Sequence, residues 1–190
     1  MVEKAPARNA VAPPVIRFDA EVQWIGDRPI VRLPAEASAE LPSRGQVAVT
    51  AVINGRVFQT VLEPDGLRGH WLAVDERMRE ALTVADGEVD VELAPVTEWP
   101  EPEIPADLQG ALDDAPDLSG TWTDISPMAR WEWVRWINAT KNPETRDRRV
   151  EVSISKLRNG KRRPCCFDLS SCTDPELSKN GRLVGGAEGD

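Results

Sequence analysis

The sequence predicts an α+β protein, with a small N-terminal β-barrel followed by a C-terminal helical domain. Residues 15–94 contain short segments in which apolar and polar residues alternate, as in half-buried strands. Residues 95–105 (PVTEWPEPEIP) are rich in proline and acid, which favours an extended linker. Beyond them the apolar residues recur at helical spacing. We therefore divide the chain into a disordered leader, a barrel, a Pro/Glu-rich linker, a helical domain and a Cys-containing mobile tail (1–14, 15–95, 96–104, 105–163 and 164–190).

Six strands separated by turn residues predict a closed or nearly closed barrel. The clearest local signal is a hairpin around Asn54-Gly55, because these residues tolerate the positive φ angles of a type I′ turn. A helical turn is expected at 34–41. A short helix at 76–82 follows Asp75, which can cap it, and presents Met78 to the core. The predicted strands are 15–25, 29–33, 45–53, 56–62, 70–74 and 87–93.

Four helices are expected in the second half of the chain. Two short ones span 106–112 and 117–123. Ser126-Pro127 is a start signal for a third that runs to about Lys141, and Asn142-Pro143 starts a fourth that stops at Gly160. The third helix carries apolar residues around most of its circumference. It is therefore expected to be central, touching both the small helices and the barrel. The alternative is that one of its tryptophans lines a ligand groove.

The charge of the 190-residue chain, −9 overall, is distributed unevenly. Residues 141–163 carry nine Lys and Arg against three Asp and Glu, whereas residues 80–129 carry 13 acids and no base. The overall acidity argues against non-specific binding of nucleic acid. Two interpretations of the basic segment remain open: it faces the acidic stretch of the same molecule, or it binds an anion.

The N-terminus lacks the apolar region of a secretory signal, and no apolar run is long enough for a membrane-spanning helix. We therefore expect a cytoplasmic protein whose three cysteines are reduced.

Ordered short motifs carry a family resemblance. Residues 15–95 resemble a bacterial barrel domain of unknown function, through F-x-A (18–20), VRLP (31–34), ING (53–55), G-x-W-L-x-V (69–74) and G-x-V-x-V-x-L (87–93). Residues 104–163 resemble the helical domain of bacteriocin-protection, YdeI/OmpD-associated proteins, through IP-x-DL-x-x-AL (104–112), W-I-x-x-x-K (136–141) and PETR-x-RR (143–149). The resemblance implies a double-split barrel of the AbrB/MazE-like class and a role in resisting antimicrobial peptides. It implies no catalytic residues.

The joint between the last two helices contains the main candidate binding residues. Arg146 precedes the apolar stripe formed by Val150, Ile154 and Leu157. One interpretation is an inter-helix ion pair, for which Asp113, Asp114 and Asp117 are the natural partners. The other is an anion or partner site beside the start of the last helix, where free amides help to hold an anion. That site would comprise Lys141, Arg146, Arg149 and Trp136.

Two further groups of residues are candidates for chemistry. His70, the only histidine, and the adjacent Trp71 mark a possible barrel site, although a lone histidine in a strand is more often a structural residue. Cys165, Cys166 and Cys172 form C-C-x₅-C, which is a poor match to the paired cysteines of structural zinc sites. The cysteines are therefore inert thiols or redox groups, with zinc a weaker alternative. We expect no metal and no cofactor.

Three functions are compatible with these observations. The first is a non-enzymatic binding or stress-protection protein, as a monomer or homodimer, whose partner is a protein or a small anionic ligand. The second is a regulator that binds nucleic acid through an AbrB-like barrel. The third is an enzyme acting near His70 at the barrel mouth, for which no hydrolase, metalloprotease or nucleotide-binding motif is present.

Overall fold

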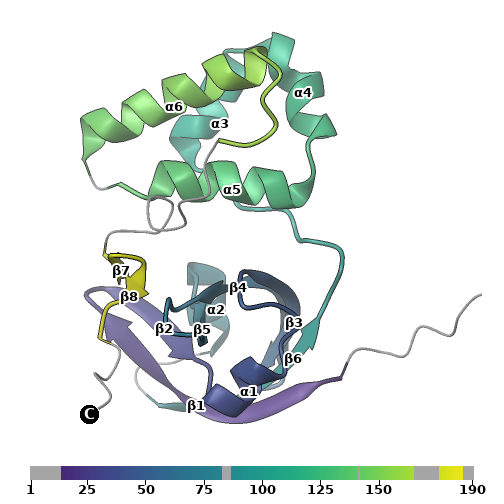
Figure 1. Cartoon of the computed structure of the whole chain (residues 1–190), viewed down its shortest axis with the longest axis vertical. Coiled ribbons are helices and arrows are strands. Elements are labelled where there is room, and N and C mark those ends of the chain that lie inside the picture. The colour runs from purple at the N-terminus through teal and green to yellow at the C-terminus, as the bar shows by residue number, and fades with distance from the viewer. Residues whose placement is uncertain (1–13, 83–86, 141, 165–175, 186–190) are drawn as a thin grey trace, which may run out of the picture.

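Six strands close into an antiparallel barrel in a computed structural model that describes residues 14–82, 87–140, 142–164 and 176–185. Around the barrel the strands follow the order β1-β2-β5-β4-β3-β6, and every neighbouring pair is antiparallel (Figure 1). The barrel confirms the predicted α+β class. Its strands are β1 (Ile16–Ile25), β2 (Arg28–Arg32), β3 (Val47–Ile53), β4 (Arg56–Pro64), β5 (His70–Ala73) and β6 (Glu88–Pro95).

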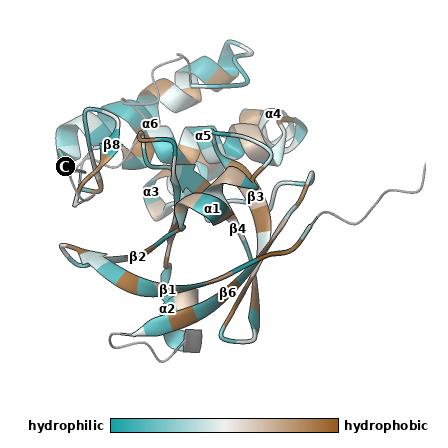
Figure 2. Ribbon diagram, turned by 60° about the horizontal axis from the view of Figure 1, so that its bottom comes forward, coloured by the Kyte–Doolittle hydropathy of each residue, from teal (hydrophilic) through white to brown (hydrophobic). Residues whose placement is uncertain are grey.

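The β3–β4 hairpin has the predicted turn. Asn54 and Gly55 have φ angles of 48° and 77°, and Ile53 pairs directly with Arg56. This register turns Val49, Ala51 and Ile53 inward, where they are fully buried. Figure 2 shows the resulting apolar residues along the strands.

Two short helices complete the barrel. In α2 (Glu76–Leu82), the Asp75 carboxylate accepts a hydrogen bond from the backbone N–H of Met78 at 2.8 Å, as expected of a cap. Met78 is thereby buried in the barrel core. Helix α1 (Ala35–Ala39) buries Ala37 and Ser38 against the barrel.

The helical domain consists of α3 (Ala106–Asp113), a 3₁₀ turn η1 (Pro116–Leu118), α4 (Ser119–Asp124), α5 (Pro127–Asn138) and α6 (Pro143–Arg158). Both predicted start signals are confirmed: Ser126 accepts from the N–H of Ala129, and Asn142 accepts from the N–H of Thr145. Helix α5 ends at Asn138, earlier than expected, because Ala139 leaves the helical region with a ψ of 33°. Asn142 is extended, as the residue before a proline favours.

Helix α5 is the centre of this domain. Trp133 and Ile137 are fully buried among residues of the other helices, and Figure 1 shows α5 between those helices and the barrel. The prediction of a central helix that touches both parts is therefore confirmed. No helix within the described ranges is long and apolar enough to cross a membrane.

The linker is held by α5. Arg130 forms a two-point ion pair with Glu101, at 2.8 and 2.6 Å, and its remaining nitrogen donates to the carbonyl oxygens of Trp122, Thr123 and Ile125. The indole N–H of Trp131 donates to the carbonyl of Pro100 at 2.7 Å. The extended segment is thus attached along the side of the helix.

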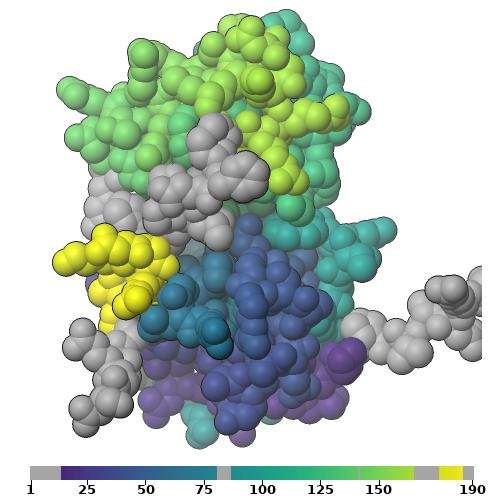
Figure 3. Space-filling model, in the orientation of Figure 1, coloured from purple at the N-terminus to yellow at the C-terminus, as the bar shows by residue number. Residues whose placement is uncertain are grey.

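Part of the tail differs from the prediction of a mobile segment. Strands β7 (Ser178–Lys179) and β8 (Arg182–Leu183) form a hairpin that packs on the barrel (Figures 1 and 3). Leu177 and Leu183 are buried there against Ile30 and Trp71. The turn is Asn180-Gly181, the same signal that predicts the β3–β4 hairpin. The predicted leader up to residue 13, the segment 165–175 and residues 186–190 lie outside the described residues.

Candidate functional site

Arg146 forms an ion pair between helices. Its Nε and Nη2 atoms donate to the two carboxylate oxygens of Asp107 at 2.5 and 3.0 Å, and Nη1 donates to the side chain of Asn138 at 3.0 Å. These hydrogen bonds lower the pKa of Asp107. The inter-helix interpretation is therefore confirmed.

The prediction of which acidic residue pairs with Arg146 was wrong. Neither Asp113, Asp114 nor Asp117 holds it, because the first turn of α3, which carries Asp107, lies beside the first turn of α6. Asp117 pairs instead with Arg158, at the other end of α6.

Other arginines of the basic segment also have acidic partners. Arg158 pairs with Asp117 at 2.9 Å, Arg163 pairs with Glu132 at 3.3 Å, and Arg162 pairs with Asp124. Three of the acids in these pairs (Asp107, Asp117 and Asp124) belong to the acidic stretch that precedes Arg130. The segment thus faces acids of the same molecule, as one of the two interpretations predicts.

Trp136 and Arg149 lie together, as the predicted site requires. The Arg149 guanidinium carbon and the Lys156 nitrogen lie 5.4 and 5.3 Å from the centre of the Trp136 ring, within the range of cation–π interactions. Arg149 also donates to the carbonyl oxygen of Trp136, and the rings of Trp133 and Trp136 form an edge-to-face pair with centroids 6.1 Å apart. The group connects α5 to α6. Lys141 lies outside the described residues, and a binding role for this joint stays a prediction.

His70 is a buried structural group. Its Nδ1 atom accepts from the Ser38 hydroxyl at 2.7 Å, because its Nε2–H donates to the carbonyl oxygen of Gly45 at 2.9 Å. Burial lowers the pKa of His70 and keeps the ring neutral. With 2% of its surface exposed and both nitrogens engaged, the ring has no free atom to act as a base.

Trp71 is also buried, with its indole N–H donating to the carbonyl of Pro64 at 3.3 Å. The carboxylate of Asp65, five residues before His70, accepts from the backbone N–H groups of Leu67 and Gly69. The candidate barrel site therefore consists of groups that satisfy one another inside the fold.

The predicted redox residues, Cys165, Cys166 and Cys172, lie outside the described residues. Within the described part of the chain, no group of His, Cys, Asp and Glu side chains could hold a metal ion.

One contact between the two domains is absent from the sequence prediction. Arg135 of α5 donates to the Glu63 carboxylate of β4 at 2.6 Å, and the Gln46 amide donates to the other oxygen at 2.9 Å. Burial raises the pKa of Glu63, and Arg135 and Gln46 oppose that rise. The two charged residues are 72 positions apart, and no local pattern connects them.

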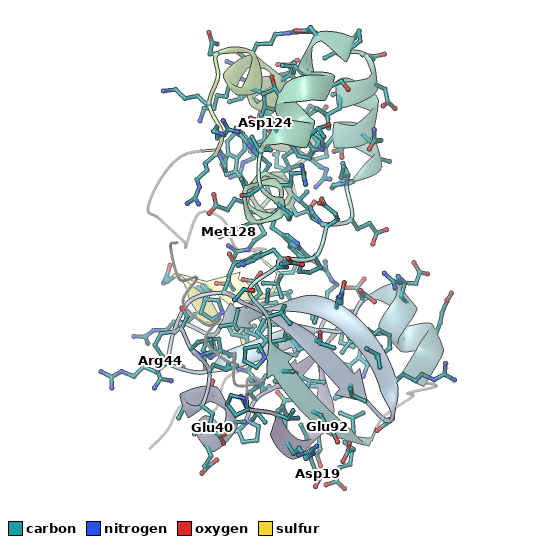
Figure 4. All side chains as sticks on the ribbon, turned by 90° about the vertical axis from the view of Figure 1, so that its right-hand side faces the viewer. Asp19, Glu40, Arg44, Glu92, Asp124 and Met128 are labelled. Atoms are coloured by element: carbon teal, nitrogen blue, oxygen red, sulfur yellow. The ribbon has the colours of Figure 1, made fainter. Side chains whose placement is uncertain are left out.

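The outer face of β1 and β6 carries like charges side by side. Asp19 pairs directly with Asp90, and Glu21 pairs directly with Glu88. All four side chains belong to exposed residues. In the next position Arg17 neutralises Glu92 at 3.0 Å. Figure 4 shows Asp19 and Glu92 on the part of the barrel that lies away from the helical domain. The outward direction of the β6 acids follows from alternation, but their pairing with the β1 acids requires the barrel.

An apolar pair, one half-buried and one exposed residue, continues this surface. Val52 of β3 pairs with Glu92 on one side and with Val57 of β4 on the other. Val57 is 67% exposed. We call the surface formed by Asp19, Glu21, Glu88, Asp90, Val52 and Val57 the acidic face.

Comparison with known families agrees with both halves of this architecture. The family described as "Bacteriocin-protection, YdeI or OmpD-Associated" matches residues 101–160, which contain α3 to α6, and the domain of unknown function DUF1905 matches residues 18–93, which contain nearly all of the barrel. The chain belongs to the YdeI/OmpD-associated family. Its barrel is the domain of unknown function at the N-terminus of this family member. No curated protein matches the chain.

Proposed function

We propose that this YdeI/OmpD-associated protein is a non-enzymatic binding protein that contributes to bacteriocin protection by holding a cationic peptide or protein segment on its acidic face. The family description supplies the biological context. The observation that carries the proposal is the pairing of Asp19 with Asp90 and of Glu21 with Glu88, because like charges directly opposite each other destabilise a sheet. A cationic partner would relieve that repulsion.

The distribution of the remaining charge supports this choice of partner. Four arginines of the basic segment are engaged by Asp107, Asp117, Asp124 and Glu132, so the segment offers less free positive charge than its composition suggests. The exposed Val57 and the half-buried Val52 beside the carboxylates suit a partner with both basic and apolar side chains. Nucleic acid would approach this face against its charge.

The test is a binding titration with two fluorescent peptides of equal length, one alternating lysine with leucine and one alternating glutamate with leucine. We expect the lysine peptide to bind, with an affinity that falls as salt rises, and the glutamate peptide not to bind. The variant Asp19→Asn/Asp90→Asn should weaken binding. The matched control Asp113→Asn/Asp114→Asn removes the same charge from the end of α3 and should leave the affinity nearly unchanged. An equal loss of affinity for the lysine peptide in both variants would show that the net charge of the protein, and not this face, attracts the peptide.

A further inference from the structure

The tail hairpin occupies a groove on the barrel that is built to receive it. Leu177 and Leu183 contact Ile30 and Trp71, with Ile25 packed at the edge. Ile30 is completely buried and Trp71 is 4% exposed. Ile30 and Trp71 form an apolar floor on β2 and β5, separate from the acidic face, whose residues belong to β1, β6, β3 and β4.

Polar groups around the floor recognise the backbone of the hairpin. The carbonyl of Asp65 accepts from the N–H of Leu183 at 2.9 Å, and the guanidinium of Arg32 donates to the carbonyl of Val184 at 2.7 Å. Contacts of this kind are independent of side-chain identity. The same groove therefore suits a second backbone of similar shape.

Gly66 sets the depth of the groove. A Cβ atom on this residue would lie 2.1 Å from the carbonyl oxygen of Gly181, a distance that atoms cannot adopt. The hairpin turn, Asn180-Gly181, fits against the barrel because Gly66 has no side chain. This close approach of two backbones indicates a specific seat for the hairpin.

The hairpin is nevertheless attached loosely. It forms its own two-stranded sheet and adds no strand to the barrel. A cavity of about 610 Å³ remains between the hairpin and the β1–β2 turn, bordered by Ile25, Asp27, Lys179 and Val184. Among the described residues, Leu177 and Leu183 supply the buried apolar contacts of this ten-residue segment with the barrel. A small apolar contact at the end of a chain is characteristic of a segment that opens locally.

The chain on the other side of the segment 165–175 is also anchored. Pro164 is buried, its carbonyl accepts from Lys156, and the carbonyl of Arg162 accepts from the indole of Trp133 at 3.3 Å. The chain therefore connects the two domains twice, through residues 96–104 and again through 165–175. Seating the hairpin ties the end of the helical domain to the barrel.

We propose that this groove is a peptide-binding site of the barrel that takes a β-hairpin carrying two leucine-type side chains, and that residues 176–185 occupy it as a detachable strap. A segment of the same chemistry supplied by another molecule competes with the strap. When the strap leaves, the second connection between the domains is released.

The test uses the full-length chain and a fluorescent peptide with the sequence of residues 176–185. In the wild type the strap occupies the groove, so the apparent affinity for the peptide is reduced by the fraction of open molecules. The variant Leu183→Asp undocks the strap and leaves the groove intact. We expect it to bind the peptide at least about tenfold more tightly than the wild type does. Equal affinity for both proteins, or no binding to either, would overturn the proposal.

A pair of glycine variants tests the seat itself. Gly66 and Gly55 both have a φ of 77°, but a Cβ on Gly55 meets nothing within 4 Å. Both Gly→Ala changes thus impose similar backbone strain, and only Gly66→Ala blocks the hairpin. Added to Leu183→Asp, Gly66→Ala should abolish peptide binding and Gly55→Ala should preserve it.

A second readout does not depend on the aspartate variant. In the single variant Gly66→Ala, hydrogen exchange of the Leu183 amide should be faster than in the wild type. In the single variant Gly55→Ala it should be unchanged. Unchanged exchange in Gly66→Ala would contradict the close seat.

Discussion

Arg135 of α5 reaches the barrel and donates to Glu63 of β4 at 2.6 Å, with 12% and 13% of the two side chains exposed. This ion pair links the two domains at a place where water is largely excluded. Removing one member of such a pair is expected to be costly, because the other charge is left buried without compensation.

Replacing Arg135 by Met tests this expectation. We predict that Arg135→Met lowers the free energy of unfolding by about 3–5 kcal/mol near neutral pH, measured by urea denaturation. The double variant Arg135→Met/Glu63→Gln should recover much of the loss, because the neutral amide retains a partner in Gln46. The control is Arg17→Met, which breaks an ion pair whose arginine is 65% exposed and should cost less than about 1 kcal/mol.

The cost of Arg135→Met should also depend on pH. Burial raises the pKa of Glu63, and the loss of Arg135 removes the charge that opposes this rise. A carboxyl with a raised pKa in the folded state binds its proton more tightly than in the unfolded chain, so its stabilising contribution is lost as the pH increases through the folded pKa. The free energy of unfolding of Arg135→Met should therefore be closest to that of the wild type near pH 5 and furthest below it near pH 8. A destabilisation that is constant between these values would show that Glu63 remains solvated.

His70 gives a separate pH dependence that is easy to isolate, because the chain has one histidine. Its pKa is lowered in the folded state from an ordinary value of 6.5, so the unfolded chain takes up the proton first as the pH falls. The contribution of the neutral His70 ring to the free energy of unfolding is fully present above pH 6.5 and declines below it. The slope of this decline is at most about 1.4 kcal/mol per pH unit. Urea denaturation between pH 7.5 and 5.5 measures this slope. His70→Gln should remove the histidine contribution, and a wild-type histidine NMR signal that titrates at or above 6.5 would contradict the prediction.

Local patterns predict much of the fold. The alternation of Val47, Val49, Ala51 and Ile53 before Asn54-Gly55 specifies one hairpin, and Ser126-Pro127 and Asn142-Pro143 specify the starts of two helices. These signals act through neighbouring backbone atoms, so the sequence displays them directly. The tail hairpin carries the same Asn-Gly signal at Asn180. Its strands of two residues are too short to show alternation, and they are stable only against Ile30 and Trp71.

The candidate site is harder to predict from the sequence than the fold, because it depends on which helices and strands come into contact. The choice of Asp107 over Asp113 as the partner of Arg146 follows from the crossing of α3 and α6, and the Glu63–Arg135 contact follows from the docking of two domains. The opposition of Asp19 and Asp90 is set by the closure of the barrel. No spacing within one element contains this information.

Arg130 should be intolerant even of lysine. Its guanidinium forms two hydrogen bonds with Glu101 and also donates to three carbonyl oxygens at the end of α4, whereas an ammonium group cannot match that fork. We predict that Arg130→Lys lowers the free energy of unfolding by about 2–3 kcal/mol. Arg148→Lys is the matched control, since Arg148 is 77% exposed and makes only a 3.8 Å contact with Glu151. Similar stabilities for the two variants would contradict the interpretation that Arg130 fixes the linker to α5.

The Arg146 variant decides between a structural and a binding role for the α5–α6 joint. Because both carboxylate oxygens of Asp107 are held by Arg146, we predict that Arg146→Ala lowers the free energy of unfolding by about 1–2 kcal/mol, a value reduced for the partial exposure of the pair. In a double-mutant cycle with Asp107→Ala the two losses should not add. Inorganic phosphate, titrated by NMR, should shift the signals of the joint equally little in the wild type and in Arg146→Ala. If phosphate instead binds the wild type and this binding disappears in Arg146→Ala without loss of stability, the residue is a ligand-binding group and the anion site predicted from the sequence is correct.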